Sequence, residues 1–594
     1  MGIAYRPEID GLRAIAVLAV VLYHAGIGGA GFVGVDVFFV ISGYLITLLL
    51  LRERRTTGRT DLLGFYARRV RRIFPAAAAV VLAVIGASSL LLSPEQQAHT
   101  AQSAGAALLF GANVFFQVTT GGYFDGPSDQ LPLLHLWSLS VEEQFYFLWP
   151  ALLMLIPRRW LVPALCGLAV ASFAAAEYWI AQGSQAAFYE MPARFWELAA
   201  GGLIAASAPR VLPRWLAPAG IVLTLAACAW PLGHFPGVGA LPAVLGACAI
   251  IAAVHGGATN PLLRSNLMVG IGLISYSLYL WHWPLLAFYR ANIIGAGSLS
   301  VRLTLCAIAL VLALGSYRYI ERPFRRLRLR SGRTVVVGAA LSSALVLCAC
   351  AVGLHARSAM AVHADNQAAV AAGRDMATKV CHISGVDRML MKCQPRSDTL
   401  VWGDSMAWSW LPAFPGASDV SMDSCEPFIG WLRDHPHPGQ IQCRDHNNLV
   451  LPLARKARVV VLGGLWNSAG EVARLAPTLD ALDAVPHVIV IGPTPTLPAP
   501  VPQCIRQHAE AACTLTRAAF DAHARPILAA LQALAGRHPN VSVVDPSDDF
   551  CTATGCPPLL NGKPLYWDSH HITRTAAASL ADRMAPASKP ATGI

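Results

Sequence analysis

The sequence predicts a multi-spanning α-helical membrane domain, with about eleven transmembrane helices, joined to an exported α/β three-layer domain. Hydrophobic residues make up 55% of the 594 residues and charged residues only 13%, about half the charged share of a soluble globular protein. Apolar blocks fill the sequence up to residue 354, and an ordinary soluble composition follows. The last apolar block, residues 334–354, is long enough to cross a bilayer as a helix.

The apolar blocks are read as a series of spans separated by polar loops. They fall at residues 12–27, 35–51, 74–92, 139–156, 160–181, 193–207, 215–231, 239–255, 268–289, 301–320 and 334–354. Residues 101–118 are apolar but contain polar side chains, and we interpret them as a non-spanning or re-entrant helix. If they crossed, the later arginine-rich loops would all face outward, against the positive-inside rule. The odd count puts the N-terminus in the cytoplasm and the C-terminal domain outside.

Three boundaries divide the chain into four segments. We expect a membrane domain over residues 1–333, a connecting transmembrane helix over 334–354, a polar linker over 355–379 and an exported domain over 380–594. Runs of Val and Ile separated by helical stretches predict a buried parallel sheet in that last domain. These runs are residues 399–405, 457–466, 487–495 and 540–548.

The cysteines and the net charge agree with this division. Eight cysteines follow residue 354, namely Cys381, Cys393, Cys425, Cys443, Cys504, Cys513, Cys551 and Cys556. An even set in an exported domain predicts disulfides, which we expect to pair in sequential order. Zinc is the competing interpretation, but no C-x-x-C pair occurs among them, so we expect no metal. The net charge of +11 comes from arginines beside apolar segments, which indicates topology and no nucleic-acid partner.

Ionisable residues inside predicted spans are costly and therefore candidates for function. Arg13 and His24 lie eleven residues apart on the first span, or roughly 16 Å along a helix. Asp36 begins the second span on the same side as His24, where a carboxylate fixes an imidazole tautomer and raises its basicity. An interfacial histidine bonded to a carbonyl group explains His24 equally well.

Two further groups of charged residues stand out. Glu142 and Glu143 lie in or beside a span, where acids serve as general bases, proton relays or partners for arginines. Arg69 and Arg72 belong to an arginine run that suits phosphate binding on the cytoplasmic side. Structural ion pairing of the acids and plain topological anchoring by the arginines are the alternatives.

The C-terminal domain carries a second pattern. Ser405 follows a Val-rich strand and opens a helical stretch, where helix N–H groups favour a developing oxyanion. Asp568 and His571 are three residues apart, a spacing that lets the carboxylate orient the imidazole, which then takes the proton of Ser405. His570 is the rival base. For the oxyanion we expect the amide of Ser405 and, more weakly, the side chain of Asn467.

Sequence motifs in both parts resemble known families. The motifs "YRPEIDGLRAIAVLAVVLYH", "GVDVFFVISGYLI", "FYARRVRRIFPA", "LWSLSVEEQFYFLWP", "SYSLYLWHWP" and "YIERPFR" resemble the membrane acyltransferase-3 family over residues 5–325. "VWGDSMAWSW" and "YWDSHHIT" resemble the SGNH hydrolase-like fold over residues 380–585. The first resemblance implies catalysis by His24 and donor handling by Arg13, Arg69 and Arg72, with Glu142 and Glu143 in a family motif of unassigned role. The second implies Ser405, Asp568 and His571 as the catalytic set.

Together the resemblances imply a bacterial surface-polysaccharide O-acetyltransferase in the cell inner membrane. We expect acetyl-CoA as the cytoplasmic donor, membrane lipids as surroundings and an exported glycan as the acceptor. Lipopolysaccharide O-antigen is the first choice, and peptidoglycan or exopolysaccharide is the alternative. A glycan acetyl-esterase in the exported domain, a transporter in the membrane part and a non-catalytic exported domain are the competing hypotheses.

Overall fold

The computed structural model describes most of the chain as two compact units. The described residues are 5–92, 94–120, 126–182, 184–230, 233–293, 297–326, 371–372, 375–376, 397–432 and 438–588. Contacts divide the chain into Met1–Met360 and Ala361–Ile594. The connecting helix predicted over residues 334–354 lies outside the described residues, as does most of the linker.

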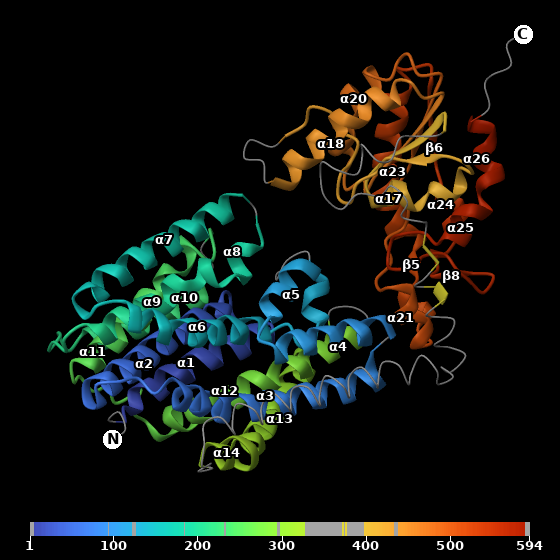
Figure 1. The fold of residues 1–594 in the computed structure, drawn as a ribbon. Coiled ribbons are helices and arrows are strands. Elements are labelled where there is room, and N and C mark those ends of the chain that lie inside the picture. Colours follow the sequence, from blue (N-terminus) through green and yellow to red (C-terminus); the bar gives the residue numbers. More distant parts are fainter. Residues whose placement is uncertain are drawn as a thin grey trace, which may run out of the picture. The chain divides into compact units, whose positions relative to one another are not determined.

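The N-terminal unit is a bundle of helices (Figure 1). Its longer helices are α1 (Pro7–His24), α2 (Gly34–Thr57), α3 (Leu62–Leu91), α4 (Pro94–Leu108), α6 (Leu136–Leu155), α7 (Leu161–Ala181), α9 (Met191–Ala206), α10 (Leu216–Ala229), α11 (Leu241–His255), α12 (Asn266–Asn292) and α13 (Leu299–Ser316). Shorter turns connect them: η1 (Gly31–Val33), α5 (Ala112–Thr119), η2 (Gly126–Gln130), η3 (Arg158–Trp160), α8 (Ala186–Tyr189), η4 (Val238–Ala240), η5 (Tyr317–Glu321) and α14 (Arg322–Arg326). Each of the ten spans predicted before residue 321 falls on one of the longer helices.

Five helical segments of the described chain are long and apolar enough to cross a membrane. They are Gly31–Thr57, Leu62–Leu91, Arg158–Ala181, Val238–His255 and Leu299–Arg326. The total of eleven spans stays a prediction. Residues 101–118 divide between α4 and α5 at Phe110, whose φ of 56° is left-handed. Neither piece reaches the roughly 20 residues that a crossing needs.

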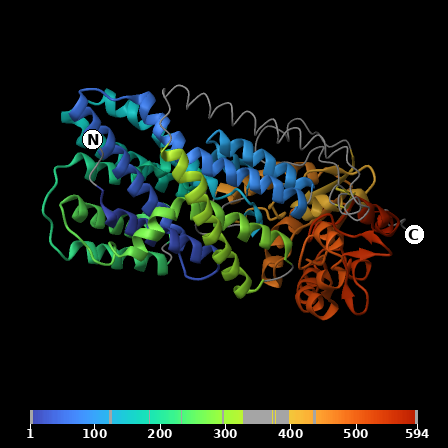
Figure 2. The ribbon, with the colours of Figure 1, turned by 90° about the horizontal axis from the view of Figure 1, so that it is seen from below.

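Close packing of α1 against α12 fixes two histidine side chains relative to each other. Gly272 of α12 lies against the backbone of α1, where a Cβ atom would stand only 1.9 Å from the carbonyl oxygen of Asp10. Both views show the helices of this unit lying side by side (Figure 2). Because the two backbones touch, His24 on α1 and His282 on α12 reach each other further along the same interface.

The C-terminal unit contains a five-stranded parallel sheet in the order β2-β1-β3-β4-β6. Its strands are β1 (Thr399–Gly403), β2 (Ser418–Asp419), β3 (Val459–Gly463), β4 (His487–Ile491) and β6 (Val541–Val544). The four predicted strands are therefore present, and the two-residue β2 was missed. Two short antiparallel pairs accompany the sheet: β5 (Leu515–Thr516) with β7 (Gly555–Cys556), and β8 (Leu559–Leu560) with β9 (Lys563–Pro564).

Alternate residues of the central strands feed two apolar cores. Val401, Val461 and Ile489 belong to one buried cluster, whereas Trp402 and Leu462 belong to another. Successive strand side chains point to opposite faces, so an apolar core lies on each face of the sheet. The helices of this unit are α17 (Ser405–Ser409), η6 (Leu411–Ala413), α18 (Pro438–Ala454), α19 (Ala469–Val472), η7 (Ala473–Leu475), α20 (Ala476–Asp480), α21 (Val501–Arg506), α22 (Glu510–Cys513), α23 (Arg517–Ala535), α24 (Ser547–Phe550), α25 (Arg574–Ser579) and α26 (Ala581–Ser588).

Disulfides form in the C-terminal unit, as predicted. The described bridges join Cys425 to Cys443, Cys504 to Cys513 and Cys551 to Cys556. Their sequential pairing is confirmed, and the expected fourth pair, Cys381 with Cys393, lies outside the described residues. The described cysteines of the helical unit are free thiols: Cys166, Cys228, Cys248 and Cys306.

Candidate active sites

A sharp turn after β1 presents Ser405 at the start of α17. Gly403 has a φ of 152°, and a Cβ atom there would stand 1.9 Å from the carbonyl oxygen of Gly463 on β3, so only glycine fits. Asp404 caps the helix by accepting the amide of Met406 at 2.8 Å, and its other oxygen accepts the amide of Leu465 at 2.7 Å. Burial raises the pKa of Asp404, and these amide hydrogen bonds oppose that rise. The G-D-S motif thus fixes the turn as well as supplying the serine.

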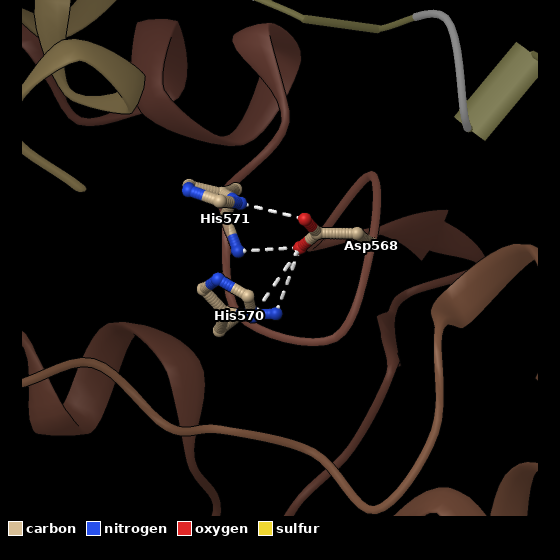
Figure 3. A group of neighbouring side chains, drawn as sticks. All are labelled: Asp568, His570 and His571. Atoms are coloured by element: carbon tan, nitrogen blue, oxygen red, sulfur yellow. Dashed lines mark hydrogen bonds and ion pairs between the residues drawn. The ribbon is translucent and has the colours of Figure 1, made fainter. Parts of the chain in front are cut away.

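A hydrogen-bonded chain links Ser405, His571 and Asp568. Nε2 of His571 lies 2.8 Å from Oγ of Ser405, and its Nδ1 lies 2.6 Å from Oδ2 of Asp568. The second oxygen of Asp568 accepts the backbone amides of His570 and His571 at 2.9 and 2.7 Å (Figure 3). Burial by itself would raise the pKa of Asp568, but the hydrogen bond and charge of His571 outweigh it and lower the pKa. Asp568 is therefore held ionised, as an orienting carboxylate must be.

The structure distinguishes His571 from its rival His570. The ring of His571 stacks on Trp567, with centroids 5.0 Å apart and planes 11° from parallel. Nδ1 of His570 lies 3.0 Å from the hydroxyl of Ser569.

Asp568, His570 and His571 also place ligand-type atoms within 4.8 Å of one another, which is compatible with a metal ion. Both ring nitrogens of His571 already contact Ser405 and Asp568, so this geometry suits proton transfer better than metal binding.

The expected oxyanion role of Asn467 needs correction. Asn467 is exposed, and its side-chain amide donates to the carbonyl oxygen of Leu465 at 3.2 Å. In the described part of the chain no hydrogen bond of Asn467 leads towards Ser405. The G-x-N spacing is absent here, and the loop after β3 turns the side chain back on its own backbone. The backbone amide of Ser405 remains a candidate donor, and the structure adds the amide of Gly464, a residue that lies close to the side chain of Asp404.

Glu426 lies beside the same loop and escaped the sequence analysis. Its Cγ stands 3.5 Å from the position of a Cβ built on Gly464. Burial raises the pKa of Glu426 to about 7, and the charges of Asp404 and Glu471 act in the same direction. No motif marks Glu426 in the sequence, because its closeness to Gly464 arises only in the folded loop.

In the helical unit a cavity is lined by the predicted donor-binding arginines. Its polar lining includes Arg13, Arg69, Arg72, Ser42, Glu142 and Tyr146. Arg13 pairs with Asp10 at 3.1 Å, and the Arg69 guanidinium lies over the ring of Phe65 at 5.7 Å. A second pocket shares Arg13 and Arg72 and adds Arg6 and Arg325. Arginines from α1, α3 and α14 thus line two spaces that share Arg13 and Arg72.

Glu142 and Glu143 occupy different environments. Glu142 lines the cavity, and its Oε1 accepts a hydrogen bond from the hydroxyl of Ser42 at 2.6 Å. The hydroxyl of Tyr146 donates to the same serine at 3.0 Å. Oε1 of Glu143 is buried and has no hydrogen-bond partner among the described residues. The structure therefore links Glu142, and not Glu143, to the cavity.

His24 lies at the end of α1 and contacts His282. Nδ1 of His24 is 3.0 Å from Nε2 of His282, and the ring of Trp283 meets His24 edge to face at 4.5 Å. Arg290 donates to the backbone carbonyl of His24. Nothing in the sequence pointed to a pairing of His282 with His24, since 258 positions separate the two histidines.

The predicted support of His24 by Asp36 is corrected by the structure. Oδ1 of Asp36 lies 2.9 Å from Nη2 of Arg194, and Nε of Arg194 lies 3.2 Å from Glu197. All three side chains are fully buried. A buried arginine needs carboxylate partners, and this requirement takes Asp36 away from the histidine.

The fold and these geometries define a helical protein with apolar membrane-type segments, joined to an α/β domain that carries a serine–histidine–aspartate chain. Residues 6–319, more than half of the chain, match the family described as "Acyltransferase domain". The chain therefore belongs to the acyltransferase-3 family. Residues 363–586 match the family described as "SGNH domain (fused to AT3 domains)".

Individual relatives agree with this assignment. The chain is 31% identical over 349 residues to the Peptidoglycan O-acetyltransferase OatA of Listeria monocytogenes, covering 54% of this chain and 56% of that protein. It is 30% identical over 352 residues to the O-acetyltransferase OatA of Staphylococcus aureus, covering 54% and 57%. The chain thus spans less than two thirds of the curated relatives that it matches.

One solved structure also matches. It is the periplasmic domain of a lipopolysaccharide acetyltransferase from Salmonella Paratyphi A, at 14% identity and a TM-score of 0.29, covering 38% of this chain and 97% of that one.

Proposed function

We propose that this chain is an O-acetyltransferase that moves acetyl from cytoplasmic acetyl-CoA to hydroxyl groups of an exported glycan. The observation that carries the proposal is the hydrogen-bonded chain from Ser405 through His571 to Asp568, at 2.8 and 2.6 Å. In this proposal the protein lies in the cell inner membrane among lipids, with a cytoplasmic N-terminus and a periplasmic C-terminal domain. The reaction uses no metal and no nucleic acid.

The donor binds in the helical unit. Coenzyme A carries several phosphates, and arginine binds phosphate through paired, charge-assisted hydrogen bonds. Arg13 and Arg72 border both the cavity and the second pocket, while Arg69 lines the cavity alone. In our proposal these arginines hold the phosphates, and the acetyl thioester extends into the cavity towards Ser42 and Glu142. His24 lines neither space, and its role as the catalytic residue that acts on the acetyl group is proposed from the family resemblance of the first span.

The transfer to glycan takes place at Ser405. Its Oγ attacks the acetyl carbonyl carbon while His571 accepts the hydroxyl proton at Nε2. The amides of Ser405 and Gly464 stabilise the oxyanion. The bond between the acetyl carbon and the donor then breaks, and His571 gives its proton to the departing donor atom, which leaves acetyl-Ser405 and a neutral His571. A sugar hydroxyl attacks this ester, giving its proton to His571, which returns it to Ser405 as the acetyl group leaves on the sugar.

The acceptor is proposed from chemistry and from relatives. Disulfides in the C-terminal unit suit a periplasmic location, so lipopolysaccharide O-antigen is our first choice. The printed name of the Listeria relative supports peptidoglycan as the alternative. Exopolysaccharide fits the same triad. An acetyl-esterase would use the same residues with water in place of the sugar, so only the direction of acetylation separates it from a transferase.

Comparison of two serine variants tests the proposal. Ser405→Ala removes the nucleophile, whereas Ser409→Ala alters a serine on the same helix α17 whose hydroxyl donates to the carbonyl oxygen of Met406 within that helix. Mass spectrometry of surface glycans should find acetyl groups lost in a Ser405→Ala strain and kept in a Ser409→Ala strain. Unchanged acetylation in the Ser405→Ala strain would refute the transferase role, and increased acetylation would identify an esterase.

A further inference from the structure

The histidine pair of the helical unit fixes which nitrogen of His24 is basic. Nδ1 of His282 lies 3.2 Å from the backbone carbonyl oxygen of Leu278, one helical turn earlier on α12. A carbonyl oxygen only accepts hydrogen bonds, so Nδ1 of His282 carries the proton. Nε2 of a neutral His282 then holds a lone pair.

The same reasoning extends to His24. Nε2 of His282 faces Nδ1 of His24 at 3.0 Å, and two lone pairs would repel each other there. Nδ1 of His24 must therefore carry a proton that it donates to His282. Because a neutral imidazole has one proton, the lone pair of His24 lies on Nε2.

Burial favours the neutral form of both rings. His282 is completely buried, and the exposed fraction of His24 is 5%. A charged group beside the pair is the guanidinium of Arg290, which donates to the backbone of His24 and lies over Trp283, 3.6 Å from Asp129. Among the described residues, the buried ring of His135 lies 6.1 Å from His282, and the phenol rings of Tyr23 and Tyr279 lie 5.3 Å from His24 and 5.5 Å from His282. A second positive charge on the pair would be costly in this setting.

We propose that His282 is the positioning residue of the membrane site, holding His24 in the tautomer with the proton on Nδ1 and the lone pair on Nε2. This inference rests on the proposed catalytic role of His24. In many catalytic sites a carboxylate accepts the hydrogen bond of the catalytic histidine, and the sequence analysis assigned that role to Asp36. In this structure His282 has that role. The contact of Gly272 with α1 and the packing of Trp283 against His24 hold the two rings in register.

Substitutions of His282 in the full-length protein test this role. His282→Gln keeps an acceptor oxygen near the position of Nε2, whereas His282→Leu removes it at similar volume. His135→Leu is the matched control, because His135 is buried nearby and neither of its ring nitrogens has a hydrogen-bond partner in the part of the chain that the structure describes. Membrane vesicles supplied with acetyl-CoA and glycan acceptor give kcat and the KM for acetyl-CoA, and size-exclusion elution in detergent checks assembly.

We expect His282→Leu to lower kcat by roughly 10²-fold, the loss typical of a misplaced general base, with KM within about twofold of wild type. His282→Gln should recover at least a tenth of the wild-type kcat, and His135→Leu should stay near wild type. Wild-type kcat in an assembled His282→Leu variant, or equal loss in the Leu and Gln variants, would overturn the inference. If the Leu variant does not assemble, the unbranched His282→Met replaces it. If His282→Met does not assemble either, His282→Gln is the only test, and a 10²-fold loss of kcat in that variant overturns the inference.

His24→Ala separates this inference from the proposed function. Loss of acetylation in His24→Ala together with normal His282→Leu activity would overturn the tautomer assignment alone. Acetylation that survives His24→Ala in an assembled protein would remove the catalytic role of His24, and both statements about the membrane site would fall.

Discussion

Two histidines, one in each unit, are held at Nδ1 by different partners. His571 donates from Nδ1 to the ionised carboxylate of Asp568 at 2.6 Å, while His24 contacts the neutral ring of His282 at 3.0 Å. A carboxylate fixes the tautomer and also stabilises the imidazolium that forms during proton transfer. A neutral imidazole fixes the tautomer alone. The C-terminal site thus stabilises a positively charged His571, whereas the helical site keeps the buried His24 neutral.

The surroundings of the two histidines explain the difference. His571 lies at the carboxyl end of a parallel sheet, where loops after β1 and β3 supply amides for charged groups such as Asp404. His24 lies between apolar helices, where an unpaired carboxylate would be costly. Two fully buried carboxylates of this unit, Asp36 and Glu197, are both bound to Arg194. A neutral partner meets the need of His24 without another charge.

The largest effect is expected from removing the charge of Asp568. Asp568→Asn keeps the size of the side chain but favours the wrong tautomer of His571, and kcat should fall by roughly 10³- to 10⁴-fold. The measurement is glycan acetylation by the full-length protein, with its thermal unfolding as a control. The pKa of Asp568 is lower in the folded than in the unfolded protein. The pairing of Asp568 with His571 therefore stabilises the wild type fully above the pKa of an unfolded Asp, and this stabilisation is lost as the pH falls through the folded-state pKa. A kcat of Asp568→Asn within tenfold of wild type would show that His571 does not depend on the carboxylate of Asp568. The proposed difference between His571 and His24 would then be wrong.

Neighbouring arginines of α3 give a smaller effect that is specific to the helical unit. Arg72 lines both the cavity and the second pocket, whereas Nε of Arg71 donates to the carbonyl oxygen of Ala67 one turn earlier. Losing one charge-assisted phosphate contact costs about 1.5–3 kcal/mol, so Arg72→Ala should raise the KM for acetyl-CoA by roughly 10- to 100-fold. Arg71→Ala should change it less than threefold. Equal effects from both variants would identify a general charge effect instead of a donor site.

Glu426 provides the smallest effect and a stability readout. Its raised pKa of about 7 means that the folded state holds the proton more tightly than the unfolded state. This contribution is fully present below about pH 4.5 and is lost as the pH rises through about 7. Thermal stability should therefore fall less over this pH range in Glu426→Gln than in the wild type. Above pH 7 the variant should be more stable than the wild type by on the order of 1 kcal/mol. A fall that persists unchanged in the variant would show that Glu426 is not its source.

Local sequence patterns predicted most of the architecture. The four long strands followed from Val and Ile runs, and the described helices up to residue 320 followed from apolar blocks of the right length. Ser405, Asp568 and His571 were predictable because each lies in a short motif whose chemistry depends on neighbours in sequence. Sequential disulfides were predictable for a similar reason, since each described pair closes a loop of at most 18 residues.

Contacts between distant segments could not be predicted from the sequence. His282 meets His24 across 258 positions, and Asp36 meets Arg194 across 158. Spacing within one helix gives no information about which other helix packs against it. Asn467 failed for a different reason, because a loop side chain has several backbone carbonyls within reach and bonded the nearest one.

The central claim is that acetyl from acetyl-CoA reaches Ser405 through the site of His24. Deuterated acetyl-CoA is supplied on the cytoplasmic side of membranes that contain the full-length protein without glycan acceptor, and the peptide carrying Ser405 is then examined by mass spectrometry. Labelled acetyl is expected on Ser405 in the wild type and none in an assembled His24→Ala variant. Equal labelling of Ser405 in the two proteins would contradict the claim.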